Sequence, residues 1–218
     1  MHRRRLTFAL TLAGAAPALL VASPATVHAQ TSSAFAQGAE LSGVRYAPTA
    51  AVGGSTLQLN GAGIRYRFVV KVYTAGLYLG GRAATPEAVL AASGPKRLHV
   101  VMLRDIDANE LGRLFTRGMQ DNAPRDEFVK SIPGTIRMGE LFAAKKRLVS
   151  GESFSVDWVP GQGTSVLING RPSGEPIKEP EFFNALMRIW LGPNPADAQL
   201  KDALLGQAQR PVTSPGQQ

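Results

Sequence analysis

Three cations and a tyrosine occur at alternate positions of the apolar stretch 61–80: Arg65, Arg67, Lys71 and Tyr73. A period of two places these side chains on one face of a strand. A guanidinium is rarely buried without an anionic partner, so the cations either lie in water at a sheet edge or face a cleft that receives an anion. No acidic residue lies within ten positions on either side of Arg65. Its partner is therefore a carboxylate that the fold brings near or one that a ligand carries.

The cysteine and histidine content excludes several kinds of site. The chain has no Cys, which removes disulfides, thiol catalysis and thiolate metal sites. Of its three histidines, His2 and His28 lie near the N-terminus and only His99 lies in the body of the chain. A zinc site or a His-based triad is therefore not expected. We predict no metal and no cofactor.

The strand that carries Arg65 and Tyr73 is predicted to run over residues 64–79, because Val, Ile, Tyr and Phe are dense there. A shorter strand, 55–60, precedes it and ends at the turn signal Asn60-Gly61, and Gly76 predicts a bulge or bend. Eight residues of straight strand span about 26 Å. This interpretation therefore separates Arg65 from Tyr73 too widely for one carboxylate to reach both.

The other elements alternate between strands and amphipathic helices. Asp107 and Glu110 form a capping-box pattern before one helix, and Phe183 belongs to an apolar stripe on another. The predicted helices are 85–92, 107–122, 135–148, 181–191 and 196–205, and the further strands are 97–103, 153–159 and 165–168. Clustered hairpins and grouped helices predict an α+β fold with helices stacked on an antiparallel sheet.

The ends of the chain have different compositions. Three arginines, an apolar stretch and Val27-His28-Ala29 predict a secretory signal peptide over 1–29 that is cleaved before Gln30 and gives an exported, periplasmic protein. A membrane anchor is the alternative, and the export route, general or twin-arginine, stays open. We predict a flexible leader over 30–40, one domain over 41–206 and a disordered tail over 207–218.

The net charge is mildly basic. Removing the signal peptide lowers it from +8 to about +5, with 21 basic against 16 acidic residues. The only dense cationic run, residues 145–147, ends a helical pattern and complements the helix dipole. We therefore expect no nucleic-acid partner and, after cleavage, no stable membrane insertion.

Several ordered blocks of the chain resemble the chalcone isomerase-like family in its bacterial exported branch. They are Gly61-Ala-Gly-Ile-Arg65, Val70-Lys-Val-Tyr-Thr-Ala-Gly-Leu-Tyr-Leu79, Leu103-Arg-Asp-Ile106, Ile189-Trp-Leu-Gly-Pro-Asn-Pro-Ala-Asp197 and Leu200-Lys-Asp-Ala-Leu-Leu-Gly206. The resemblance implies an open-faced sandwich, a large antiparallel sheet covered on one side by helices. The family includes plant enzymes that close chalcones to flavanones, and members without this activity, among them fatty-acid-binding proteins.

The resemblance also implies roles for individual residues. Arg65 matches the ligand-facing arginine of the family, and Tyr73 matches a position that is tyrosine in the fatty-acid-binding branch and threonine in the plant enzymes. The enzymes' other polar groups fall near Leu111, Gly118 and Ile189, none of which has a polar side chain. The resemblance therefore implies Arg65 and Tyr73 as ligand-binding residues and leaves catalytic residues unknown.

Three hypotheses for function follow. The first is a non-enzymatic protein that binds a fatty acid or similar amphipathic carboxylate in a groove between sheet and helices. The alternative is an isomerase, an intramolecular lyase that closes a chalcone-like substrate with Arg65 stabilising developing negative charge. The third is a periplasmic scaffold without a ligand. The sequence leaves ligand identity, chain length and oligomeric state open.

Overall fold

A computed structural model describes residues 35–207. The predicted signal peptide, residues 30–34 of the predicted leader and residues 208–218 of the predicted tail lie outside the described residues. The strands are β1 (Ala39–Leu41), β2 (Val44–Tyr46), β3 (Thr49–Val52), β4 (Ser55–Arg67), β5 (Val70–Leu79), β6 (Lys96–Met102), β7 (Ile106–Asp107), β8 (Arg147–Leu148), β9 (Ser153–Val159), β10 (Gly163–Ile168) and β11 (Arg171–Ile177). The helices are α1 (Pro86–Ala91), α2 (Ala108–Asn122), α3 (Arg125–Lys145), α4 (Pro180–Leu191) and α5 (Ala198–Leu204).

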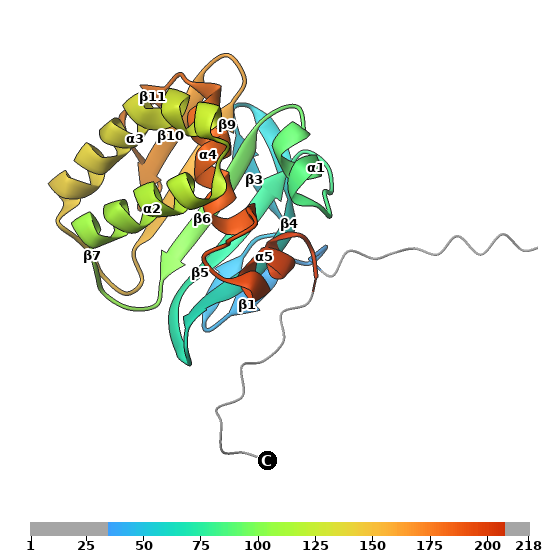
Figure 1. Cartoon of the computed structure of the whole chain (residues 1–218). Helices are drawn as coiled ribbons and strands as arrows, with labels where there is room; N and C mark the ends of the chain where they lie inside the picture. Colours follow the sequence, from blue (N-terminus) through green and yellow to red (C-terminus); the bar gives the residue numbers. More distant parts are fainter. Residues whose placement is uncertain (1–34, 208–218) are drawn as a thin grey trace, which may run out of the picture. The chain divides into compact units, whose positions relative to one another are not determined.

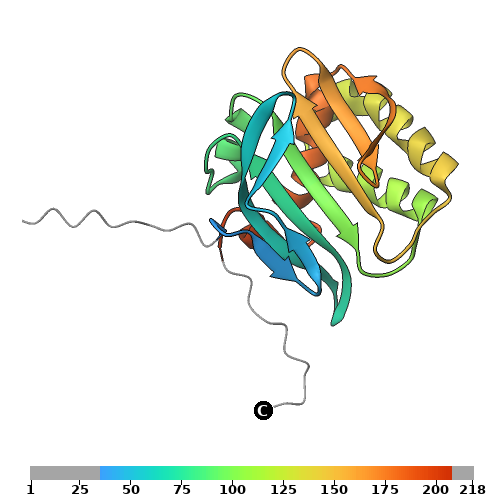
Figure 2. The same ribbon diagram turned by 180° about the vertical axis from the view of Figure 1, so that it is seen from behind.

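Seven strands form one antiparallel sheet in the order β11-β10-β9-β6-β5-β4-β3. Helices α2, α3 and α4 lie together over one face of this sheet (Figure 1). The view from behind shows the strands in front of these helices (Figure 2). The arrangement confirms the predicted α+β fold, a large antiparallel sheet covered on one side by helices.

The two faces of β5 pack against different groups. Tyr73, Leu77 and their alternate neighbours belong to the main core under the helices. Tyr78 belongs to a smaller apolar cluster on the other face, together with Tyr46 of β2. Strand β5 thus contributes side chains to both apolar clusters, because successive side chains of a strand point to opposite faces of the sheet.

Gly76 is required for close approach rather than for a bulge. It pairs regularly with Ala62 on one side and His99 on the other. A Cβ at this position would collide with the ring of Tyr46. The predicted bulge at Gly76 is therefore wrong, and the register shifts of this strand pair lie instead between Leu59 and Gly61 and next to Arg65.

The predicted helix cap agrees with the structure more closely than the predicted buried faces of the helices do. Asp107 caps α2 by accepting the backbone N–H of Glu110 at 2.9 Å, as the capping pattern predicts. On α4, helical spacing predicts that Leu186 and Trp190 lie on the stripe of Phe183, and all three are buried. On α2, the same spacing predicts a buried stripe of Leu111, Leu114, Phe115 and Met119. Three of these four are buried, and Leu114 is 41% exposed.

Helix α3 starts ten residues earlier than predicted and continues through Pro133. Helical spacing predicts a buried stripe of Ile136, Met138, Leu141 and Phe142 on this helix. Met138 and Phe142 are buried, but Ile136 is 58% exposed. The prediction for Ile136 is wrong because the buried face also includes Ser131 and Gly134. No helix in the described part of the chain is long and apolar enough to cross a membrane.

Candidate functional site

Arg65 and Tyr73 lie directly opposite each other on neighbouring strands. Residues 64–79 form a hairpin rather than one strand, because β4 ends at Arg67 and β5 begins at Val70 after a two-residue turn. Opposite residues in an antiparallel pair have Cα atoms about 4.5–5.5 Å apart. The predicted separation of about 26 Å along a straight strand is therefore wrong. The predicted end of the preceding strand at Asn60-Gly61 is wrong as well, since β4 continues through it.

A bulge adjoins this residue pair. The register of β4 against β5 shifts between Arg65 and Tyr66, so that Arg65 pairs with Tyr73 while Tyr66 pairs with Lys71. Bulges bend a strand and re-aim side chains, and they are frequent next to functional sites. Here the extra residue is Val72 of β5, between the partners of Arg65 and Tyr66.

The guanidinium of Arg65 lies against the ring of Tyr73. Its central carbon is 5.5 Å from the ring centroid, within the range of a cation–π contact. Its Nε is shielded from solvent and has no hydrogen-bond partner within residues 35–207. Arg65 also forms no ion pair with any residue that the structure describes. An aromatic face compensates its charge in part, and a donor on the guanidinium is left without an acceptor.

Tyr73 is buried and holds its hydroxyl in a defined position. The indole Nε1 of Trp190 on α4 donates a 2.8 Å hydrogen bond to this hydroxyl. Burial raises the pKa of Tyr73, an effect that the nearby Arg65 charge reduces. The phenol is therefore neutral at neutral pH, and within the described residues its proton has no acceptor. Tyr73 can donate a hydrogen bond toward a group placed beside Arg65.

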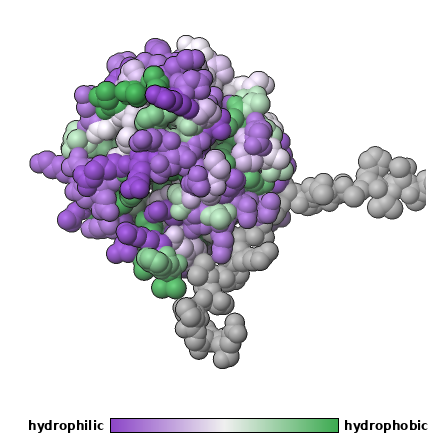
Figure 3. Space-filling view, viewed as in Figure 1, coloured by the Kyte–Doolittle hydropathy of each residue, from purple (hydrophilic) through white to green (hydrophobic). Residues whose placement is uncertain are grey.

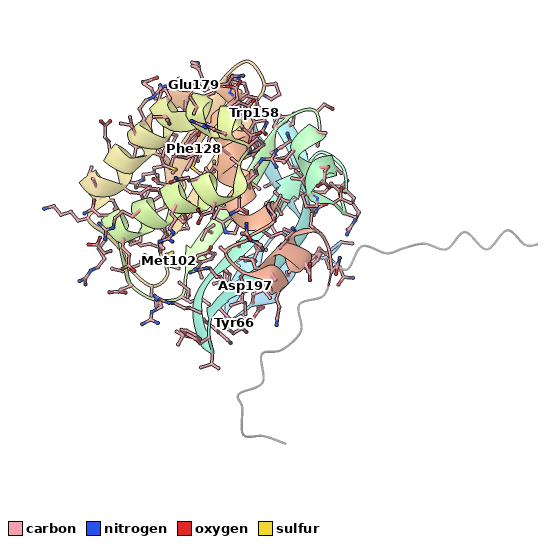
Figure 4. All side chains as sticks on the ribbon, viewed as in Figure 1. Tyr66, Met102, Phe128, Trp158, Glu179 and Asp197 are labelled. Carbon is pink, nitrogen blue, oxygen red and sulfur yellow. The ribbon has the colours of Figure 1, made fainter. Side chains whose placement is uncertain are left out.

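Asp197 fixes the C-terminal segment against the hairpin. Its two carboxylate oxygens accept the backbone N–H of Leu200, which caps α5, and that of Tyr66 on β4, at 3.0 and 2.8 Å. Figure 4 shows Asp197 and Tyr66 close together at the lower end of the described domain. The carboxylate therefore holds the strand next to Arg65 without forming an ion pair with Arg65 itself.

A cavity of about 170 Å³ opens beside Arg65 and Tyr73, between the hairpin and helices α2 and α4. Its lining combines apolar side chains with polar and charged ones. It consists of Arg65, Tyr73, Leu111, Leu114, Phe115, Arg117, Gly118, Asp121, Asn122, Ile189, Asn194 and Ala196. Leu111, Gly118 and Ile189 are the three positions where the resemblance places polar groups of the enzymes. They do lie at one cavity here, and none of them offers a hydrogen-bonding side chain.

Asn122, one of the polar residues that line the cavity, was missed by sequence reasoning. Its amide donates to the carbonyl of Gly118 and to that of Asn194, both at 2.9 Å. Its side-chain oxygen accepts the backbone N–H of Asn194 at 2.7 Å. The whole amide is therefore used in joining α2 to the loop after α4. The only sequence signal for it is an Asn at a helix end.

Two further hollows adjoin this region. One of about 490 Å³ shares Arg65 and Leu114 with the first cavity and is lined by three arginines and three acidic residues. The three arginines are Arg65, Arg67 and Arg104; the acidic residues are Asp105, Asp107 and Glu110. The other, about 940 Å³, is an open groove between α2 and α3. The charged residues of that groove are all exposed, so no buried charge lines it that would select a ligand.

The described residues contain no group of three or more His, Asp or Glu side chains that could hold a metal ion. His99, the one histidine among them, contacts Ser155 through its Nδ1 at 2.8 Å on the sheet. His99 does not line the cavity beside Arg65 and Tyr73. The candidate site is thus built around one arginine, one tyrosine and an apolar cavity.

Comparisons with known proteins agree with this architecture. Among solved structures, the crystal structure of a fatty-acid binding protein from Arabidopsis thaliana is similar, with a TM-score of 0.61 and 13% sequence identity over 78% of this chain and 96% of that one. At this identity the likeness shows the fold alone. No curated protein sequence matches the chain. The family described as chalcone isomerase-like matches residues 38–206, which is most of the chain. The chain therefore belongs to the chalcone isomerase-like family.

Proposed function

We propose that this protein binds an amphipathic carboxylate, such as a fatty acid, with its head group beside Arg65. The observation that carries the proposal is the Nε of Arg65, shielded from solvent and without a hydrogen-bond partner at the edge of an apolar cavity. A buried donor without an acceptor is unfavourable, and a charged donor more so. A ligand carboxylate would accept from the guanidinium in a charge-assisted bond.

Tyr73 would provide a second contact to the same head group. Its neutral hydroxyl is fixed by Trp190, so its proton can point toward an acceptor near Arg65. The alkyl part of the ligand would then lie along Leu111, Phe115 and Ile189. The lining thus offers polar groups beside apolar side chains, which is the general character of small-molecule sites.

The size of the cavity restricts the ligand. Sites for drug-sized ligands measure about 300–1,000 Å³, and the cavity beside Arg65 measures about 170 Å³. A short acyl chain fits this volume. A longer chain would leave through the hollow that shares Leu114, where that side chain is 41% exposed. We therefore expect stronger binding of medium-chain than of long-chain acids.

Two observations support a binding function over a catalytic one. The chain belongs to a family whose fold it shares with a protein named for fatty-acid binding. In addition, the cavity has apolar or small residues at Leu111, Gly118 and Ile189, where a ring-closing enzyme needs hydrogen-bonding groups. The isomerase alternative keeps Arg65, the only charged residue of the cavity lining that is not exposed.

We propose further that the protein acts outside the cytoplasm, as a member of an exported branch of the family. The basis is the sequence of residues 1–29, with its cations, apolar stretch and small residues before Gln30. The intact mass of the protein from the soluble periplasmic fraction tests this directly. A chain that begins at Gln30 is expected, and the uncleaved chain in alkaline-washed membranes would contradict it.

Extraction of bound molecules tests the binding proposal. Purified protein is denatured in organic solvent, and the extract is analysed by mass spectrometry beside an extract of the Arg65→Leu variant. Carboxylic acids in the wild-type extract and their depletion from the variant are expected. Equal amounts in both extracts would argue against Arg65 as the anchor. Turnover of a chalcone by protein without such acids would favour the isomerase.

A further inference from the structure

The tip of the β4–β5 hairpin exposes three consecutive apolar residues. Phe68 is 89% exposed, Val69 54% and Val70 41%. Phe68 and Val69 form the turn itself, and Val70 begins β5. In the space-filling view, an apolar group lies at the lower edge of the described domain, where Figure 1 places the end of this hairpin (Figure 3).

The backbone at the tip is unusual for the residue that occupies it. Phe68 has a φ of 57°, at the first position of a two-residue hairpin turn. Glycine is favoured at such a position, and a bulky residue there is an outlier. Folding alone would therefore favour glycine over phenylalanine. A strained residue that also exposes a large apolar ring points to a role outside the fold.

Cations flank this apolar tip in the sequence, and the stretch of chain around it has no acidic residue. Arg67 and Lys71 flank the three apolar residues, and both are exposed. Between Glu40 and Glu87 the chain has no acidic residue, whereas it has Arg45, Arg65, Arg67, Lys71 and Arg82. Arg104, on the loop after β6, lines the same hollow as Arg67, together with the acidic residues Asp105, Asp107 and Glu110. Neither Arg67 nor Arg104 forms an ion pair with any residue in the described range.

We propose that this hairpin tip docks the protein reversibly on the surface of an anionic lipid bilayer. Phe68 and Val69 enter the boundary between head groups and acyl chains, while Arg67 and Lys71 remain at the level of the anionic head groups. An exposed apolar group with a cationic rim is suited to such an interface. Each cation near an anionic membrane surface adds attraction.

The small size of the tip favours a membrane over a protein partner. A stable protein interface buries about 800 Å² on each side, and three consecutive residues at a turn supply only a fraction of that area. A bilayer needs only a few inserted apolar side chains, because charge supplies the remaining attraction. The same argument disfavours a second copy of this chain as the occupant.

The tip also lies next to the entrance of the candidate binding site. Arg65, on β4, lies three residues before Phe68 in the sequence. The hollow lined by Arg65 and Arg67 adjoins the smaller cavity. Docking would turn this entrance toward the bilayer, where amphipathic acids accumulate. This consequence rests on the proposed carboxylate binding. The docking itself does not, and the two are tested separately.

Vesicle flotation with the Phe68→Gly variant tests the proposal. Vesicles of phosphatidylcholine alone are compared with vesicles of phosphatidylcholine and phosphatidylglycerol in equal amounts, for the full chain and for the chain that begins at Gln30. Variants are compared only at equal length, so any contribution of residues 1–29 cancels. The wild type is expected to float with the anionic vesicles, and Phe68→Gly to bind roughly tenfold more weakly or worse.

Phe68→Gly has an advantage as a probe, because glycine relieves the positive φ and the variant is expected to fold at least as well as the wild type. The matched control is Ile136→Ala, which removes a 58% exposed apolar side chain from α3 and should leave vesicle binding unchanged. Arg67→Gln should weaken binding to anionic vesicles about fivefold. Carboxylate binding should persist in Phe68→Gly, which separates docking from the proposed function.

Three outcomes would overturn the proposal. The first is equal vesicle binding by Phe68→Gly and wild type. The second is equal binding to neutral and anionic vesicles. The third is the absence of vesicle binding together with a dimer in light scattering that Phe68→Gly dissociates, which would assign the tip to a second copy. A Phe68→Trp variant adds a direct readout, since its added indole emission should shift to the blue with anionic vesicles.

Discussion

Arg65 and Tyr73 face each other across the β4–β5 hairpin, with the guanidinium carbon 5.5 Å from the centre of the phenol ring. The pair joins the sheet to α4, because Trp190 donates its indole proton to the same phenol. The site thus consists of residues from three separate segments of the chain. Its chemistry, a cation and a neutral donor at an apolar cavity, suits a carboxylate.

The Trp190–Tyr73 hydrogen bond should be measurable as a coupling in stability. Tyr73→Phe removes the acceptor and leaves the buried indole N–H unpaired, which costs about 1–3 kcal/mol. Trp190→Phe should cost at least as much, because it also removes buried area. In urea denaturation the double variant should lose less stability than the two single losses added together. Strict additivity would mean that the hydrogen bond contributes nothing.

The hairpin turn is the feature that sequence reasoning could not find. Two-residue turns are recognised by Asn-Gly, Asp-Gly or a leading Gly, and here the turn is Phe68-Val69 inside a continuous β-branched run. One strand was therefore predicted where the structure has two. The missed turn does not change the chemistry expected of Arg65 and Tyr73. It does make the predicted distance between them wrong, because the hairpin places them opposite each other.

Other differences have similarly local causes. Pro133-Gly134 looks like a helix breaker, yet α3 continues through it. Gly134 serves a different purpose there, because a larger side chain would collide with Phe182. Strand β11 escaped prediction because it contains Pro172 and Pro176, which suit only the edge position that it occupies. Helices with clear caps, such as α2 after Asp107, were found within a residue of their starts.

The stripe of α4 offers a test of the core. Phe183 is 1% exposed and lies against Trp158 with ring centroids 5.9 Å apart. Phe183→Ala should lower the free energy of unfolding by about 3–5 kcal/mol, as large-to-small core substitutions do. Val129→Ala on α3, where the side chain is 54% exposed, is the control and should change it by less than about 0.5 kcal/mol. A loss of under ~1 kcal/mol for Phe183→Ala would contradict the packing described.

Glu152 should contribute to the acid limb of stability. Hydrogen bonds from Lys145, the backbone of Val149 and Asn169 lower the pKa of Glu152 from 4.5 to about 2. A carboxyl with a lowered folded-state pKa stabilises the fold above its unfolded pKa, and this contribution is lost as the pH falls through the folded value. The window of loss therefore runs from pH 4.5 down to about 2.

Urea midpoints measured across that window, for wild type and Glu152→Gln, test this expectation. The wild type should be more stable at neutral pH, and the difference should shrink as the pH approaches 2. The hydrogen bond from Lys145 to Glu152 links α3 to the turn before β9. If the stability difference between wild type and Glu152→Gln stays constant at every pH, Glu152 acts through packing and not through its charge.

The central claim is that Arg65 anchors a carboxylate, and a titration of wild type and Arg65→Leu with octanoate tests it most directly. Titration with 1-octanol is the uncharged control, and thermal melts of both proteins are measured in parallel. The account predicts that octanoate affinity falls by about 1.5–3 kcal/mol in the variant, the range for hydrogen bonds to charged groups. Octanol binding should change little, and the melting temperature should stay equal or rise slightly, because a poorly compensated charge is removed. Unchanged octanoate affinity together with a large drop in melting temperature would contradict the account and make Arg65 a structural residue.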